Sequence, residues 1–135
     1  MGEAKGGCLC GAVRYTLKNP PEAVVLCHCS HCQKVTGSAF STNALVAEAD
    51  IAFDGEMASY ADTADSGNSL SRRFCGRCGS SLGSQSPRRP GIFILKVGTL
   101  DDSSALRTAA AQIWTRSKQP WVAFAFETQM FEQGR

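Results

Sequence analysis

The sequence has no long hydrophobic run, no strong excess of charge and no apolar leader. Each of these absences excludes a class of function or location. A membrane-spanning helix needs about 18 apolar residues, and the runs at 23–26 and 121–126 fall far short. The net charge is +2, and no basic stripe is interleaved with aromatic residues, which argues against a nucleic-acid-binding surface. The first seven residues lack the apolar stretch of a secretory signal. We therefore expect a cytoplasmic protein that binds neither nucleic acid nor membrane.

Long helical periodicity is also missing, and short strand signals dominate the chain. Val13, Tyr15 and Leu17 alternate with polar residues, which is the period of a half-buried strand. One helical turn is predicted at 30–35, and Gly37 is expected to end it. The 135 residues contain no internal repeat or linker, so we expect one domain over 1–135. The predicted fold class is mainly β, with strands at 13–17, 23–27, 40–48, 51–54, 70–74, 92–97, 112–115 and 121–126, and loops at 61–69 and 84–91.

Cysteine, by contrast, is abundant, and its arrangement is typical of metal ligands. An odd count of seven and the lack of an export signal favour a reducing compartment, where thiols stay free to bind metals. Zinc is the expected ion, because thiolates hold it tetrahedrally and closed structural sites commonly use four of them. The clusters are Cys8 with Cys10, Cys27 with Cys29 and Cys32, and Cys75 with Cys78.

Two of these clusters are expected to share one structural zinc ion. The segment Cys75-x-x-Cys78-Gly79 has the pattern of a zinc knuckle, in which a tight turn brings two thiolates to one metal. Cys8 and Cys10 lie two residues apart, so on a strand both sulfur atoms would face the same side. The sequence therefore predicts a closed site made of Cys8, Cys10, Cys75 and Cys78.

The remaining three cysteines predict a second zinc site with an open fourth position. Cys27, Cys29 and Cys32 supply three thiolates, and the vacant position can accept water or an outside thiol. A thiol bound there would be held as a thiolate. Three readings of the histidines stay open: His28 or His31 could close this site as a fourth ligand, His31 could carry a proton beside it, or both could simply be partners for backbone groups.

These motifs resemble those of the glutathione-dependent formaldehyde-activating enzymes. The resemblance implies an Mss4-like, zinc-stapled β-sandwich or barrel with short helical turns, two zinc ions per chain, and glutathione bound near the three-cysteine zinc. It also implies a carbon–sulfur lyase that forms or breaks S-(hydroxymethyl)glutathione or a related thiol adduct. The similar segments are 7–15 (GCLCGAVRY), 27–40 (CHCSHCQKVTGSAF), 74–79 (FCGRCG), 97–102 (VGTLDD) and 113–118 (IWTRSK).

One position departs from the family pattern, and several residues are candidates for the substrate. The family usually has a histidine before the Ile-Trp pair, where this chain has Gln112. The carboxylates of glutathione need cationic partners, for which Lys34, Arg88 and Arg89 are candidates. The alternatives are a thiol carrier and a zinc-stabilised protein-interaction module, neither of them catalytic. A sulfoxide reductase is disfavoured, because no cysteine after Cys78 is left as a nucleophile. The sequence does not indicate an oligomeric state.

Overall fold

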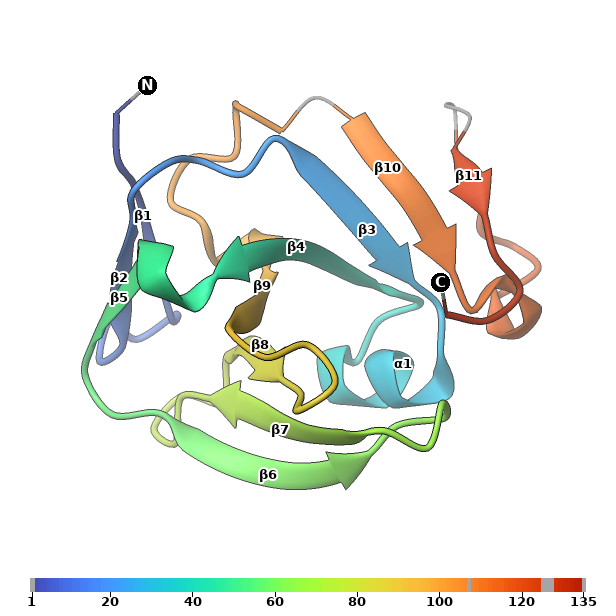
Figure 1. Ribbon diagram of the computed structural model, residues 1–135, viewed down its shortest axis with the longest axis horizontal. Helices are drawn as coiled ribbons and strands as arrows, with labels where there is room; N and C mark the ends of the chain where they lie inside the picture. The colour runs from blue at the N-terminus through green and yellow to red at the C-terminus, as the bar shows by residue number, and fades with distance from the viewer. Residues whose placement is uncertain (1, 107, 125–127, 135) are drawn as a thin grey trace.

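Short strands with alternating burial build almost the whole protein, as the mainly β prediction requires (Figure 1). The computed structural model describes residues 2–106, 108–124 and 128–134. A small sheet has the strand order β1-β2-β5 and a large sheet the order β11-β10-β3-β4-β9-β8-β7-β6. Within the described ranges, no helix has the length and hydropathy that crossing a membrane requires. The strands are β1 (Ala4–Gly7), β2 (Arg14–Leu17), β3 (Ala23–Cys27), β4 (Ser41–Ala47), β5 (Ile51–Asp54), β6 (Ala58–Thr63), β7 (Ser69–Phe74), β8 (Ser81–Gln85), β9 (Ile92–Lys96), β10 (Thr108–Ile113) and β11 (Gln129–Met130).

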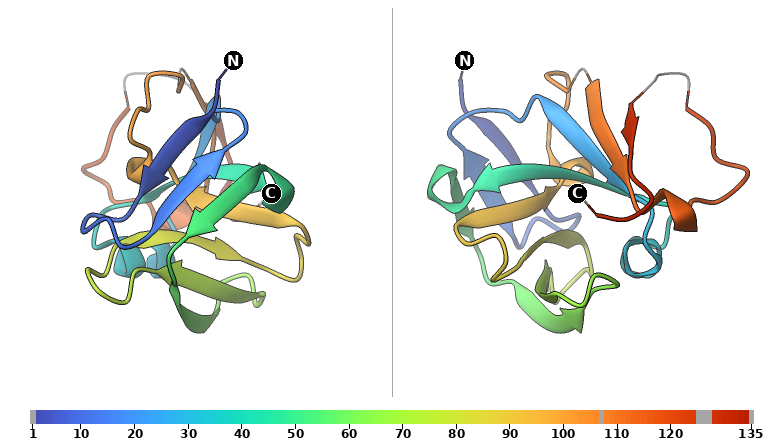
Figure 2. Two further views of the ribbon diagram at one scale, coloured as in Figure 1. Left: turned by 90° about the vertical axis from the view of Figure 1, so that its left-hand side faces the viewer. Right: turned by 45° about the vertical axis from the view of Figure 1, so that its right-hand side comes forward.

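One α-helix, α1 (Ser30–Thr36), lies across the molecule from the small sheet (Figures 1 and 2). Cys29 caps its N-terminus by accepting a hydrogen bond from the amide of Cys32. Gly37 ends it in the left-handed conformation, at φ 64°, which glycine adopts without steric cost. The described part of the chain also contains three short 3₁₀ segments: η1 (Glu48–Asp50), η2 (Val97–Thr99) and η3 (Thr115–Ser117).

The core lies where the small sheet packs against β8 and β9. Leu17, Leu82 and Leu95 are fully buried there. The ring of Phe53 packs on Tyr15 at 5.7 Å and on Phe93 at 5.1 Å between ring centres. These contacts join β2 and β5 of the small sheet to β9 of the large one, so the two sheets share one apolar interior.

The structure corrects the predicted loop at 61–69. Strand β6 continues to Thr63 and β7 starts at Ser69, so only residues 64–68 connect them. Because β6 is the edge strand of the large sheet, its residues need not be apolar, and the polar sequence concealed the strand. The predicted loop at 84–91 is similarly shorter, because β8 extends to Gln85.

The C-terminal strand predictions also need correction. Strand β10 begins at Thr108 and stops at Ile113, because Trp114 takes a left-handed conformation with φ 57°. The strand predicted at 121–126 does not form over 121–124, and its last two residues lie outside the described ranges. Trp121 is 73% exposed, so this segment is not a buried strand. The sheet ends instead with β11, which pairs in parallel with β10.

Candidate metal centres

The first group of sulfur atoms comes from two turns, one in each sheet. The sulfur atoms of Cys8, Cys10, Cys75 and Cys78 all lie within 4.8 Å of one another. The Cys8–Cys10 and Cys10–Cys75 sulfur distances are 3.7 and 3.8 Å. A zinc ion with bonds of about 2.3 Å to four sulfur atoms requires a tetrahedral edge of about 3.8 Å. Both the donor atoms and their spacing therefore fit a closed, four-coordinate zinc ion.

Two turns present these four cysteines. Cys75 and Cys78 lie in the turn between β7 and β8, where Gly79 takes a φ of +82° that favours glycine. The amides of Arg77 and Cys78 point at the sulfur of Cys75, at 3.4 and 3.5 Å. This arrangement has the features of the predicted knuckle.

Cys8 and Cys10 lie in the turn between β1 and β2, and not on a strand as the sequence argument assumed. Strand β1 ends at Gly7, and the turn closes through a 2.9 Å hydrogen bond from the amide of Cys8 to the carbonyl of Val13. The amide of Val13 in turn donates to the sulfur of Cys8 at 3.2 Å. A tight turn therefore brings the two sulfur atoms together where an extended strand was expected to do so.

The second group of sulfur atoms surrounds the junction of β3 and α1. Cys27 is the last residue of β3, Cys29 caps α1, and Cys32 lies in the first turn of that helix. All three are buried and their sulfur atoms lie within 4.8 Å of one another. Among the described residues, no fourth histidine, cysteine or carboxylate joins them. Three soft sulfur donors suit zinc and leave one position for another ligand.

Both histidines of the motif have other partners. The Nε2 atom of His28 lies 2.8 Å from Oε1 of Gln112, and its ring packs against Phe40 and Phe124. Burial lowers the pKa of this imidazole, so it stays neutral. His31 reaches Asp62 through Nδ1 at 2.9 Å and Asp65 through Nε2 at 3.2 Å. The geometry thus gives no support to either histidine as a fourth ligand.

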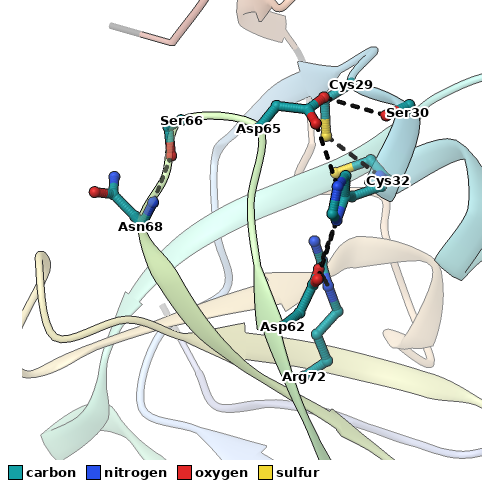
Figure 3. A network of polar contacts seen from close by, with 9 residues as sticks. Cys29, Ser30, Cys32, Asp62, Asp65, Ser66, Asn68 and Arg72 are labelled. Atoms are coloured by element: carbon teal, nitrogen blue, oxygen red, sulfur yellow. Dashed lines mark hydrogen bonds and ion pairs between the residues drawn. The ribbon is translucent and has the colours of Figure 1, made fainter.

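The contacts of His31 tie α1 to the β6–β7 hairpin. Asp62 also accepts a hydrogen bond from Nε of the buried Arg72 at 2.9 Å, and Asp65 accepts one from the hydroxyl of Ser30 (Figure 3). The connection at 64–68 is therefore held beside Cys29 and Cys32, and its residues help to form the cavity described next.

A cavity of about 190 Å³ borders the three-cysteine group. Its charged lining is entirely cationic, and no carboxylate contributes to it among the described residues. The apolar part includes Leu70, Ile113 and Trp114. A cationic lining beside thiolates favours an anionic ligand with an apolar portion. The cationic residues are Arg72, Arg88, Arg89 and Lys96, and the other polar ones Asn43, Ser66, Asn68, Ser84 and Ser86.

The structure separates the three predicted substrate residues. Arg88 and Arg89, from the β8–β9 loop, line the cavity. Lys34, on α1, lines a different hollow together with His31 and Asp62. Lys34 is therefore close to the cysteines in the chain, but it does not line the cavity that they border.

Sequence reasoning missed Lys96, a buried cation of the cavity. It ends an otherwise apolar strand, and a lysine in such a run was a signal that could have been noticed. Its Nζ donates to Oδ1 of Asn43 at 2.7 Å. Burial lowers the pKa of Lys96, and the negative charge of the three thiolates opposes this effect.

The three thiols differ in their pKa values. Hydrogen bonds from the thiols of Cys27 and Cys29 hold the pKa of Cys32 far below that of a free thiol, and Lys96 and the hydroxyl of Ser41 add to this effect. The same sulfur–sulfur contacts raise the pKa of Cys27. These contacts therefore favour the thiolate form of Cys32, the form that binds metals.

The fold and the two sulfur groups define a mainly β protein whose two cysteine clusters could each hold a metal ion. The sequence model of the glutathione-dependent formaldehyde-activating enzymes matches residues 3–117, so the chain belongs to that family. A Halomonas elongata protein, provisionally named as such an enzyme, is 29% identical over 123 residues, which cover 87% of this chain and 78% of that protein. A crystal structure of a Rhodobacter sphaeroides protein has a TM-score of 0.56 at 24% identity, covering 72% of this chain and 87% of the other. At that identity the structural likeness shows the fold alone.

Proposed function

We propose that the protein is a zinc-dependent carbon–sulfur lyase that forms or breaks S-(hydroxymethyl)glutathione or a related thiol adduct. The observation that carries the proposal is a cluster of three buried thiols beside a cavity whose charged lining is entirely cationic. Family membership supplies glutathione and formaldehyde as the leading substrates. The sulfur group and the cavity supply a place for a thiol whose other end carries negative charge.

Two zinc ions per chain are part of this proposal. Cys8, Cys10, Cys75 and Cys78 would hold a structural ion, and Cys27, Cys29 and Cys32 a second one beside the cavity. When bound at the second site, zinc would supply a position at which a thiol is kept as a thiolate. The seven free thiols also suit the reducing, cytoplasmic location that we propose. We further propose that residues 1–135 form a single domain.

Arg88 and Arg89 are proposed to orient the thiol substrate. Glutathione carries two carboxylates, and a guanidinium group binds a carboxylate through two parallel hydrogen bonds. Both arginines face the same cavity as the three cysteines, so a thiol anchored through its carboxylate would point its sulfur toward that group. Lys34 is left out of this role, because it lines a separate hollow.

A thiol carrier without catalysis is the second candidate. Among the described residues, the cavity lining contains no histidine, aspartate or glutamate that could move a proton. Both nitrogen atoms of His31 contact carboxylates, and His28 contacts Gln112. Three thiolates also donate electron density to a metal, which weakens its action as a Lewis acid. These features favour holding and orienting a thiol over driving a demanding reaction.

A calorimetric titration of glutathione tests the proposal, using protein shown by elemental analysis to contain two zinc ions per chain. Binding should disappear in Cys29→Ser and weaken about tenfold or more when Arg88 and Arg89 are both replaced by Gln. Lys34→Gln is the matched control and should bind as the wild type does. Exchange of ¹³C-formaldehyde with glutathione, followed by NMR, then separates the two candidates: acceleration identifies the lyase, and binding without acceleration identifies the carrier.

A further inference from the structure

Lys96 is a buried cation without a carboxylate partner. Its side chain is 8% exposed at the end of β9. Among the described residues, no aspartate or glutamate lies within ion-pair distance of its Nζ atom. Burying an isolated charge is costly, and buried charges are normally paired or bound to metal centres. The groups that can balance Lys96 are the three thiols on the same cavity wall.

A directed row of hydrogen bonds leads from Lys96 toward these thiols. The ammonium group of Lys96 can only donate, so it fixes Oδ1 of Asn43 toward itself, at 2.7 Å. The amide nitrogen of Asn43 then points the other way and donates to the hydroxyl oxygen of Ser41 at 2.9 Å. Since that oxygen already accepts a hydrogen bond, its own proton is available for the sulfur of Cys32, whose pKa the Ser41 hydroxyl lowers.

The sheet register builds this row. Ser41 and Asn43 lie two residues apart on β4, so their side chains share one face. Asn43 pairs directly with Lys96 on β9, and Ser41 pairs directly with Cys27 on β3. Three adjacent strands thus place the cation, the amide, the hydroxyl and the thiol of Cys27 in order on one side of the large sheet.

We propose that Lys96, acting through Asn43 and Ser41, is the charge-balancing residue that lets the three-cysteine centre accept an anionic ligand. The inference rests on the proposed function insofar as that ligand is a thiol. Three thiolates and one divalent ion leave a net charge of about −1, and an added thiolate brings it to about −2. Lys96 offsets one unit from within the protein, where salt screens it little.

This assignment names the class of ligand that the cavity selects. An anion gains from Lys96, whereas a neutral thiol, an alcohol or an alkyl group of the same size does not. The cavity should therefore bind thiols with release of their proton. It should also bind small inorganic anions that have no resemblance to glutathione.

Spectroscopy of the cobalt-substituted protein tests the inference without an activity measurement. Cobalt(II) takes the place of zinc, and azide or glutathione is titrated while the visible bands that change are recorded; Cys29→Ser identifies the bands that belong to the three-cysteine group. Lys96→Gln keeps a donor for Asn43 but removes the charge, and it should weaken both ligands about tenfold or more. Lys96→Arg should bind both within about threefold of the wild type. Lys18→Gln removes an equal charge from an exposed side chain beside Asp50 and should have no effect.

Asn43→Asp provides a second variant in case Lys96→Gln does not fold. The new carboxylate would pair with Lys96 and cancel its charge in place, so azide should again bind about tenfold more weakly. Ser41→Ala should shift the sulfur-to-cobalt charge-transfer band without loss of cobalt, because a donor to a ligand sulfur is removed.

Each outcome decides one of the two proposals. Wild-type affinity for azide in Lys96→Gln or in Asn43→Asp overturns the role of Lys96. Azide binding that depends on Lys96, without any glutathione binding in the wild type, supports the role of Lys96 and refutes glutathione as the thiol of the proposed function. Failure of the wild type to bind either ligand overturns both.

Discussion

The substitution Gln112→Met tests what the unusual glutamine of this chain does. Gln112 is buried, its Oε1 lies 2.8 Å from Nε2 of His28, and its amide nitrogen donates to the hydroxyl of Thr128 at 3.1 Å. It does not line the cavity, although its neighbours Ile113 and Trp114 do. The structure therefore gives Gln112 a structural role: it is the hydrogen-bond partner of Nε2 of His28, the residue that follows β3. We expect Gln112→Met to change stability and leave glutathione binding intact.

The size of the effect follows from the two hydrogen bonds. Methionine has a similar length but cannot accept the hydrogen bond from Nε2 of His28, and His28 has no solvent access. An unsatisfied buried donor costs about 1–3 kcal/mol, and the bond to Thr128 adds about 0.5–1.5 kcal/mol. Since a domain of this size is stable by only about 5–15 kcal/mol, the variant should unfold about 5–15 °C below the wild type.

Thermal unfolding at a fixed zinc concentration measures this effect, with glutathione calorimetry alongside it. Gln129→Met is the matched control, because Gln129 is exposed on β11 and pairs with Ala111, the residue before Gln112. That control should change the free energy of unfolding by less than about 0.5 kcal/mol. A Gln112→Met protein with normal thermal stability and no glutathione binding would refute the structural role and place Gln112 in the ligand site.

Two further predictions concern the structural metal and the buried tyrosine. Cys75→Ser should remove one zinc ion and unfold the protein, as measured by circular dichroism, because structural zinc contributes about 10–16 kcal/mol to folding. Cys32→Ser should also lose one ion but stay folded. Equal unfolding of both variants would contradict the division of the cysteines into a structural and an open site. Burial raises the pKa of Tyr15 to about 12, so the folded state holds this proton more tightly than the unfolded state. The resulting stability is present below about pH 10 and is lost as the pH rises through about 12. The stability gap between the wild type and Tyr15→Phe should therefore narrow over that interval in chemical denaturation, and a constant gap would count against it.

The grouping of the cysteines could be predicted because metal-ligand spacing is a local property. Cys27, Cys29 and Cys32 span six residues, and a strand end followed by one helical turn is enough to bring their sulfur atoms together. The same holds for the knuckle at Cys75 and Cys78. Strands with one buried face, such as β2 and β5, were equally predictable, since their apolar residues follow the period of the backbone.

Prediction failed where a neighbouring strand or a single backbone angle decided the outcome. The polar segment of β6 forms a strand because β7 pairs with it over six residues. Trp114 ends β10 through a left-handed backbone conformation, which aromatic side chains rarely adopt and no sequence pattern signals.

The composition of the cavity was not predictable from any one segment. Lys34 stands close to Cys32 in the chain, yet it faces another hollow. Lys96 stands 64 residues after Cys32 and shares a cavity wall with it. Helix α1 sends neighbouring residues in different directions, whereas the register of β9 against β4 fixes the position of Lys96.

The sequence by itself determined the donor chemistry of this protein, which consists of seven thiols divided into four and three. In the three-cysteine motif, two histidines are the other strong metal ligands. Tertiary structure alone decided that both histidines contact other partners. It also decided that Lys96, Arg88 and Arg89 line the same cavity as the three-cysteine group. The physical reason is range. Ligand spacing is set within one or two turns of the backbone, whereas the charge around a metal site depends on strands and loops that meet only when the sheet has formed.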